Sequence, residues 1–144
     1  MTRLVVTAAV IEQDGRYLVT RRLEGVHLEG YWEFPGGKRD AAESLAACLA
    51  RELREELDVE ASVGDEVFTT THHYDDRSVE LHFFSCELRG VPRPLLGQEM
   101  RWVARAELGT LQFPPADAEL IAALVRKAEP TTRDGTRCAD PSAP

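Results

Sequence analysis

A change in the periodicity of apolar residues at residue 44 is the feature that most constrains the fold. Between residues 44 and 57 the apolar side chains recur with helical spacing, whereas the segments before and after them consist of short β-branched runs. The members of this helical stripe are Ala46, Leu49, Ala50, Leu53 and Leu57. Ser44 is suited to cap the helix, and Asp40 with Glu43 offers an alternative capping box. An amphipathic helix within a strand-rich chain has to bury its apolar side against a sheet.

Strand-like runs lie on both sides of this helix. They cover residues 4–11, 17–20, 31–34, 66–71, 79–88 and 100–104. The first two are joined by Asp14 and Gly15, a strong hairpin signal, and a break is expected at Gly64. Two prolines at 114–115 open a second helix that reaches about residue 127. Its predicted buried face consists of Leu120, Ile121, Leu124 and Val125. This order of elements predicts an α+β or α/β sandwich.

Length, charge and cysteine content limit the possible classes of protein. The 144 residues suffice for one domain, assigned to residues 1–128, and residues 129–144 are expected to form a flexible tail. The net charge of −8 argues against nucleic acid polymers and anionic membranes as partners. The apolar stretches are far shorter than the ~20 residues of a membrane span, and we find no secretory signal before the first strand. The three cysteines show no metal-binding spacing, so we expect reduced thiols and a cytoplasmic protein.

Three glutamates on the first helix carry the clearest chemical signal. Glu52, Glu55 and Glu56 share one flank of the helix near its carboxyl end, where negative charge is unfavourable. A hard divalent cation would relieve this repulsion, and oxygen ligands favour Mg²⁺ or Mn²⁺. Arg51 reaches Glu55 at i+4 and could hold its carboxylate in place. The helix alone is equally consistent with a solvated acidic face, but a Gly-Gly turn fifteen residues upstream of Glu52 favours the metal site.

The chain resembles the Nudix family, whose signature is G-x5-E-x7-R-E-U-x-E-E-x-G-U with U a bulky aliphatic residue. The matching residues are Gly37, Glu43, Arg51, Glu52, Leu53, Glu55, Glu56 and Val59. Asp58 stands where the family has its last glycine, a residue that ends the helix with positive φ, which Asp tolerates better than most residues. The segments 20–22, 32–38 and 113–117 are similar to the MutT-type branch, which removes oxidised nucleotides.

This resemblance, which extends over about residues 4–127, implies the Nudix α/β/α sandwich with a mixed central sheet. It also implies a metal-dependent pyrophosphohydrolase that cuts a nucleoside triphosphate into monophosphate and pyrophosphate and that sanitises oxidised dNTPs such as 8-oxo-dGTP. By the family pattern, Glu55, Glu56 and the carbonyl of Gly36 would hold Mg²⁺, with Mn²⁺ possible, and Glu52 would be the general base or a further ligand. Leu96 occupies the usual place of a downstream acidic ligand, so Glu99 is only an approximate substitute.

Five residues are candidates for substrate contacts by the same resemblance. Arg22 and Lys38 could bind phosphate or base, although isolated basic residues are more often solvated. Phe34 and Phe113 could stack on the base or belong to the core. Asp117 follows Pro-Pro-Ala, and its carboxylate suits N7–H of an 8-oxopurine or the amine of cytosine, but it could also stabilise a helix N-terminus.

Alternatives to oxidised purine substrates therefore stay open. One is a CTP or modified dCTP pyrophosphohydrolase, and another is a catalytically silent nucleotide-sensing module. The retained Glu52, Glu55 and Glu56 argue against the silent module. We expect a nucleoside triphosphate as the small-molecule partner, and a monomer or homodimer as the oligomeric state.

Overall fold

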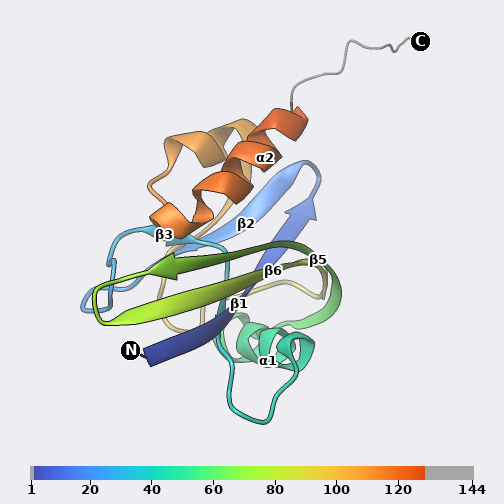
Figure 1. Ribbon diagram of the computed structural model, residues 1–144. Helices are drawn as coiled ribbons and strands as arrows, with labels where there is room; N and C mark the ends of the chain where they lie inside the picture. Colours follow the sequence, from blue (N-terminus) through green and yellow to red (C-terminus); the bar gives the residue numbers. More distant parts are fainter. Residues whose placement is uncertain (1, 129–144) are drawn as a thin grey trace.

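A computed structural model describes residues 2–128, so the tail predicted for residues 129–144 lies outside the described residues. Seven strands form one mixed sheet with α1 below it and α2 above it (Figure 1). The predicted α/β/α sandwich is confirmed. The strands are β1 Thr2–Gln13, β2 Arg16–Arg21, β3 Trp32–Glu33, β4 Gly36–Lys38, β5 Glu60–His73, β6 Arg77–Arg89 and β7 Met100–Ala104. The helices are α1 Leu45–Leu57 and α2 Ala118–Ala128, with short 3₁₀ turns η1 Arg105–Thr110 and η2 Pro115–Asp117.

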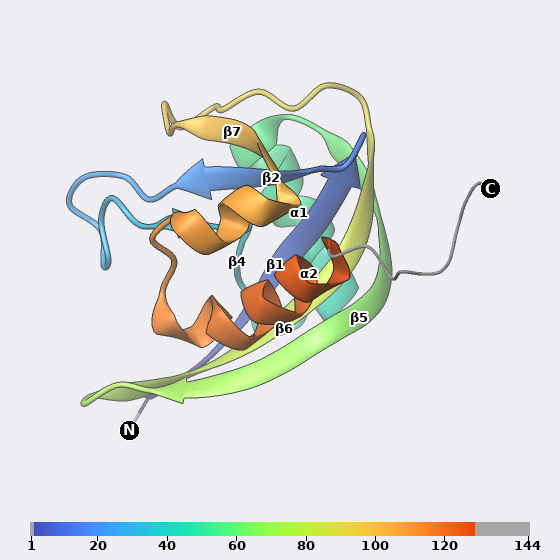
Figure 2. The same ribbon diagram turned by 90° about the horizontal axis from the view of Figure 1, so that it is seen from above.

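The sheet spreads apart between β1 and β2. The strand order is β3-β2-β1-β6-β5, with β4 paired to β1 and β7 to β2. β1 runs parallel to β6 along its length but pairs with β2 only at Glu12 and Gln13. The rest of β2 therefore diverges from β1, and β4 takes the free edge of β1 (Figure 2). Asp14 and Gly15 both have positive φ, 52° and 78°, which is the type I′ geometry expected of this hairpin.

The predicted helix α1 is capped at both ends by its own sequence. Ser44 is the N-cap, with Oγ accepting a 3.1 Å hydrogen bond from the Ala47 amide. At the other end Asp58 adopts the left-handed conformation, φ 53°, that is expected of the residue that replaces the family's glycine. Leu49, Leu53 and Leu57 are fully buried against the sheet, while Ala46 is exposed.

The loop before β7 is tied to the carboxyl end of α1. The amide of Arg93 donates to the carbonyl of Leu57 at 2.8 Å, and the amide of Leu95 donates to the carbonyl of Glu56 at 3.0 Å. The guanidinium of Arg93 also pairs with the carboxylate of Asp58. These bonds satisfy carbonyl groups that the last turn of a helix leaves unpaired.

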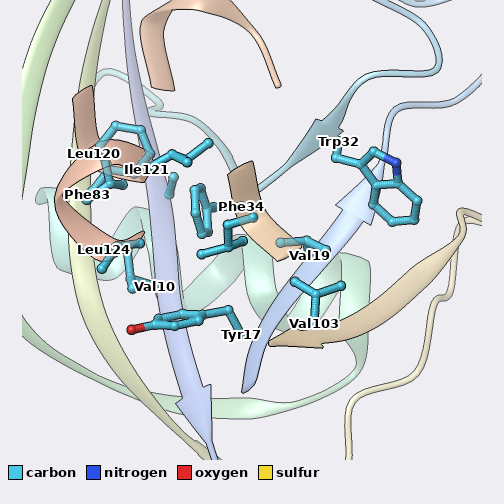
Figure 3. Packing of buried hydrophobic residues seen from close by; sticks show 12 residues of the cluster. Val10, Tyr17, Val19, Trp32, Phe34, Phe83, Val103, Leu120, Ile121 and Leu124 are labelled. Atoms are coloured by element: carbon cyan, nitrogen blue, oxygen red, sulfur yellow. The ribbon is translucent and has the colours of Figure 1, made fainter. Parts of the chain in front are cut away.

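Apolar side chains fill both sides of the sheet. On the α1 side they come mainly from α1, from β6 and from the C-terminal half of β1. On the α2 side, Leu120, Ile121 and Leu124 pack on residues from β1, β2, β6 and β7 (Figure 3). Phe34, from the segment between β3 and β4, lies edge-on to Phe83 within this second cluster, with ring centroids 6.0 Å apart. The burial of these apolar side chains is the main contribution to the stability of the domain.

Four details differ from the sequence-based expectation. Gly64 does not break a strand, because β5 continues through it with a bulge between Val63 and Phe68. The Gly-Gly segment is itself a strand, β4, because glycine at 36 lets the backbone approach Thr7 closely. The segment after β7 forms the 3₁₀ turn η1, and the second helix begins with the 3₁₀ turn η2 rather than directly at Pro114.

None of the helices within residues 2–128 is long and apolar enough to span a membrane.

A polar ladder crosses β5 and β6 on the α1 face of the sheet, beyond the helix. His82 bonds Glu66 through Nδ1 and Glu80 through Nε2, both at 2.6 Å, and Arg3 also pairs with Glu80. Burial by itself lowers the pKa of His82, but the two carboxylates outweigh it and the net pKa is raised.

Candidate active site

Arg51 gathers the acidic residues of the site around one guanidinium. Its Nε and Nη2 bond the carboxylate of Glu43 at 2.5 and 2.9 Å. Its Nη1 bonds Glu52 at 3.0 Å and, one turn along the helix, Glu55 at 3.1 Å. The hydrogen bonds from Arg51 lower the pKa of Glu43 to about 2. The predicted contact with Glu55 is therefore present, and Glu43 is the strongest partner of Arg51.

Glu52 lies directly against the glycine strand. A β-carbon at Gly37 would overlap the Glu52 carboxylate, and one at Gly36 would overlap the backbone of Thr7. Both glycines are therefore needed for close packing, Gly36 against β1 and Gly37 against α1. The carbonyl of Gly37 accepts a 3.4 Å hydrogen bond from the hydroxyl of Thr7, which holds β4 in place.

Glu56 is a buried carboxyl group with no positively charged partner among the described side chains, and it holds its proton at neutral pH. Burial raises the pKa of Glu56, a hydrogen bond with Glu52 and the charges of Glu52, Glu33 and Glu55 raise it further, and it reaches about 9. Within residues 2–128 no three His, Cys, Asp or Glu side chains are already gathered as a metal cluster. A desolvated carboxyl beside two other carboxylates and a glycine strand nevertheless fits a divalent cation, whose charge would replace the proton.

A cavity of about 550 Å³ extends from these glutamates to η2. Glu52, Glu56, Gly36 and Lys38 line it, and so does Asp117 of η2. Much of the rest of its wall is apolar and consists of Leu4, Val6, Val79, Leu81 and Phe83. A concave site of this size, with a few polar groups on an apolar wall, can enclose a nucleotide.

Arg22 and Glu33 form an ion pair in the wall of the cavity. Arg22 Nη1 bonds Glu33 Oε1 at 2.8 Å, and Arg22 Nε donates to the carbonyl of His27 at 2.5 Å. Burial raises the pKa of Glu33, although Arg22 opposes this shift. Arg22 was a sequence candidate, whereas Glu33 was missed because an acidic residue on a short strand has no distinctive spacing.

Asp117 is 5 % exposed and lines the cavity from η2. Burial, with a smaller contribution from the charge of Glu33, raises its pKa to about 7. Among residues 2–128 its carboxyl group forms no side-chain hydrogen bond, although its amide donates to the carbonyl of Pro114 at 3.0 Å. The carboxyl group of Asp117 therefore lies in the cavity wall without a hydrogen-bond donor from the described residues.

Of the other residues that the sequence suggested for the site, some line the cavity and others do not. Phe34 lines the cavity, and Phe113 stacks on it from behind, with ring centroids 5.4 Å apart. Lys38 lines the cavity with an exposed side chain, and Glu55 is 59 % exposed beside Arg51. The structure does not bring Glu99 to the cavity, because its carboxylate bonds two arginines of the neighbouring strands, Arg21 at 3.3 Å and Arg101 at 3.1 Å.

Two residues at the turn between β5 and β6 also line the cavity. These are Tyr74, in the turn, and Arg77, the first residue of β6. His27, from the loop after β2, lies edge-on to the Tyr74 ring with centroids 5.3 Å apart. β5, which leads into this turn, contacts η2, the segment that contains Asp117. Long-range pairing of this kind leaves no local signal in a sequence.

Comparisons with known proteins identify the same region. A sequence model described as the NUDIX domain matches residues 6–123. Among curated relatives, the CTP pyrophosphohydrolase of Escherichia coli is 37 % identical, over 87 % of this chain and 93 % of the relative. The 8-oxo-dGTP diphosphatase of Haemophilus influenzae is 36 % identical, over 85 % and 91 % of the two chains.

A solved structure agrees with these matches. The solution structure of the E. coli ORF135 protein superposes with a TM-score of 0.78 at 35 % identity, and covers 91 % of this chain and 96 % of its own.

Proposed function

Since the chain belongs to the Nudix family, and is thus a hydrolase acting on phosphorus anhydrides, we propose that it cleaves nucleoside triphosphates into nucleoside monophosphate and pyrophosphate. One observation carries this proposal. A single cavity is lined both by two glutamates of α1, Glu52 and Glu56, and by a buried acidic side chain, Asp117. The two glutamates suit phosphates with a bound cation, and Asp117 suits a base.

The residues of α1 are assigned to the cleavage step. Glu55 and Glu56, with the carbonyl of Gly36, would hold Mg²⁺, or Mn²⁺ in its place. Such an ion neutralises phosphate charge and lowers the pKa of a bound water. Glu52, fixed between Arg51 and β4, takes the proton from the attacking water while the bond between phosphorus and the departing pyrophosphate oxygen breaks.

Asp117 supports an oxidised purine as the preferred base. An ionised carboxylate accepts hydrogen bonds, and an 8-oxopurine offers N7–H where guanine offers only an acceptor. A cytidine nucleotide is the second candidate, because its exocyclic amine suits the same carboxylate and because a curated relative is named a CTP pyrophosphohydrolase. We propose that the protein acts in the cytoplasm on the nucleotide pool.

A panel of substrates tests the proposed activity. We expect kcat/KM for 8-oxo-dGTP to exceed that for dGTP by more than tenfold, and that for ADP-ribose to be far lower, with CTP and dCTP measured alongside. Higher values for CTP than for 8-oxo-dGTP would favour the second candidate. No Mg²⁺-dependent release of pyrophosphate from any triphosphate would contradict the proposed function.

Variants of the helix test the assigned site. Glu55→Gln and Glu56→Gln should each reduce the rate of pyrophosphate release by at least a hundredfold, about 2.7 kcal/mol. Glu119→Gln, on the exposed side of α2, is the matched control and should leave the rate unchanged. Near-native rates for both helix variants would remove these carboxylates from the mechanism.

A further inference from the structure

The side-chain amide of Gln98 connects the loop before β7 to the last turn of α1. Gln98 is 7 % exposed, and both of its polar atoms have partners. Its Oε1 accepts a 2.9 Å hydrogen bond from the amide of Leu96, and its Nε2 donates to the carbonyl of Glu56 at 3.3 Å. A buried amide with both bonds made costs little, whereas removal of either partner leaves a buried polar group unpaired.

The main chain of Glu56 is held from outside the helix. Its carbonyl accepts the bond from Gln98 and a second one, at 3.0 Å, from the amide of Leu95. The last carbonyls of a helix have no partner within the helix, and helix ends fray. Because α1 ends at Leu57, Glu56 belongs to this last turn. The position of its backbone therefore depends on the bonds from the loop.

Gln98 also fixes the shape of the loop that supplies the second bond. The amide of Gly97 donates to the carbonyl of Pro94 at 3.2 Å, and Gly97 has a positive φ of 78°, so the chain turns tightly here. The amide of Leu96 lies inside this turn, and Oε1 of Gln98 is its acceptor. One side chain thus stabilises the turn and holds the end of α1.

Gln98 lies beside Glu56 without lining the large cavity. The two residues line a second, smaller cavity of about 150 Å³, and Glu56 lines the large cavity as well. A substrate in the large cavity would thus meet the side chain of Glu56 rather than that of Gln98. This placement suits a residue that acts through Glu56.

We propose that Gln98 is a positioning residue for Glu56, which holds the last turn of α1 so that the Glu56 carboxylate keeps the place from which it binds a divalent cation. This inference rests on the proposed function, which assigns Glu56 to the cation. Groups that orient a metal ligand raise metal affinity, because the ligand is fixed before the ion arrives. Without the bond from Gln98, the backbone of Glu56 gains freedom and its carboxylate moves with it.

Binding of Mn²⁺ without nucleotide tests this role apart from catalysis. We would measure the Kd of Mn²⁺ by electron paramagnetic resonance for the wild type, Gln98→Met and Gln98→Asn. Methionine has nearly the volume of glutamine but forms neither bond, and asparagine is too short to keep both. Arg93→Met is the matched control, because the Arg93 side chain joins the same loop to the same helix end through Asp58 and not through Glu56. Thermal unfolding confirms that each variant is folded.

We expect both Gln98 variants to weaken Mn²⁺ binding by about tenfold, and Arg93→Met to stay within about twofold of the wild type. Pyrophosphate release by Gln98→Met should be about tenfold slower at limiting Mg²⁺ and should recover in excess Mg²⁺. A variant that is merely less stable would not show this recovery. Unchanged Mn²⁺ affinity in both Gln98 variants, or an equal loss in Arg93→Met, would overturn the proposal.

A double variant tests whether Gln98 acts through Glu56. Gln98→Met should slow pyrophosphate release at limiting Mg²⁺ in the wild type but by no more than about twofold in the Glu56→Gln background, since the carboxylate that it positions is then absent. A full tenfold further loss in that background would overturn the assignment, because Gln98 would then act elsewhere.

The same measurements separate this inference from the proposed function. If the wild type binds Mn²⁺ and cleaves triphosphates but the Gln98 variants bind the ion equally well, the inference alone is wrong. If Gln98→Met weakens Mn²⁺ binding but the wild type cleaves no triphosphate, the proposed function is wrong and the positioning role of Gln98 stands. A wild type that binds no Mn²⁺ would overturn both.

Discussion

Replacing Asp117 by asparagine should stabilise the protein, and by an amount that depends on pH. Burial raises the pKa of Asp117 from 3.8 to about 7, so between these values the folded protein binds a proton that the unfolded chain has released. Stability therefore falls as pH rises through this range. The full effect, about 3 pKa units at 1.36 kcal/mol each, is about 4 kcal/mol above pH 7 and absent below pH 3.8.

The measurement is urea unfolding of wild type and Asp117→Asn in EDTA at pH 5 and pH 8. About 2 kcal/mol of the effect is already present at pH 5, so the advantage of the variant should grow by about 2–3 kcal/mol between the two pH values. All other titrating groups cancel in this comparison, because both proteins contain them. A difference that stays constant within about 0.5 kcal/mol would refute the claim that Asp117 is buried at the expense of its charge.

A second variant identifies the cause. Because the charge of Glu33 is the secondary contribution to the shift, Glu33→Gln should reduce the pH-dependent part of the Asp117→Asn effect without abolishing it. If the effect vanished altogether in the Glu33→Gln background, the charge of Glu33 rather than burial would be its main cause.

Three further changes test other parts of the structure. Gly37→Ala places a β-carbon on the Glu52 carboxylate and should lower the rate of pyrophosphate release by about a hundredfold with only a small change in Tm; an active variant would contradict the role of this packing. Leu53→Ala, at a fully buried position, should lower the free energy of unfolding by about 2–5 kcal/mol in urea titrations. His82→Gln should destabilise by about 1 kcal/mol below pH 6.5, and this loss should disappear as pH rises through the raised pKa of His82; a loss that does not change with pH would contradict the role of its two carboxylate partners.

The sequence was sufficient for features that depend on local spacing. The helical stripe placed α1 to within one residue, because leucines at this spacing can be buried together only on a helix. Asp58 could be expected to end that helix in the left-handed conformation, since its side chain tolerates positive φ. The Arg51–Glu55 contact followed from their separation of one helical turn.

Features that depend on pairing across the sheet could not be predicted from the local spacing of residues. Whether Gly64 breaks a strand is decided by its partner β6, which keeps β5 extended on both sides of a bulge. Tyr74 and Arg77 reach the cavity because β5 and β6 project their turn towards η2, a contact between segments about 40 residues apart. Glu99 was placed near the metal by its position before Trp102, but strand pairing put two arginines beside it instead.

The bonds between the loop before β7 and the last turn of α1 have a practical consequence for engineering. Since Arg93 and Leu95 donate directly to the carbonyls of Leu57 and Glu56, added residues in this loop would pull on the turn that carries Glu56. A fluorescent tag or epitope spliced there should impair turnover even though the loop is on the surface. The exposed hairpin at Asp14 and Gly15 forms no such link to α1 and is the better insertion point.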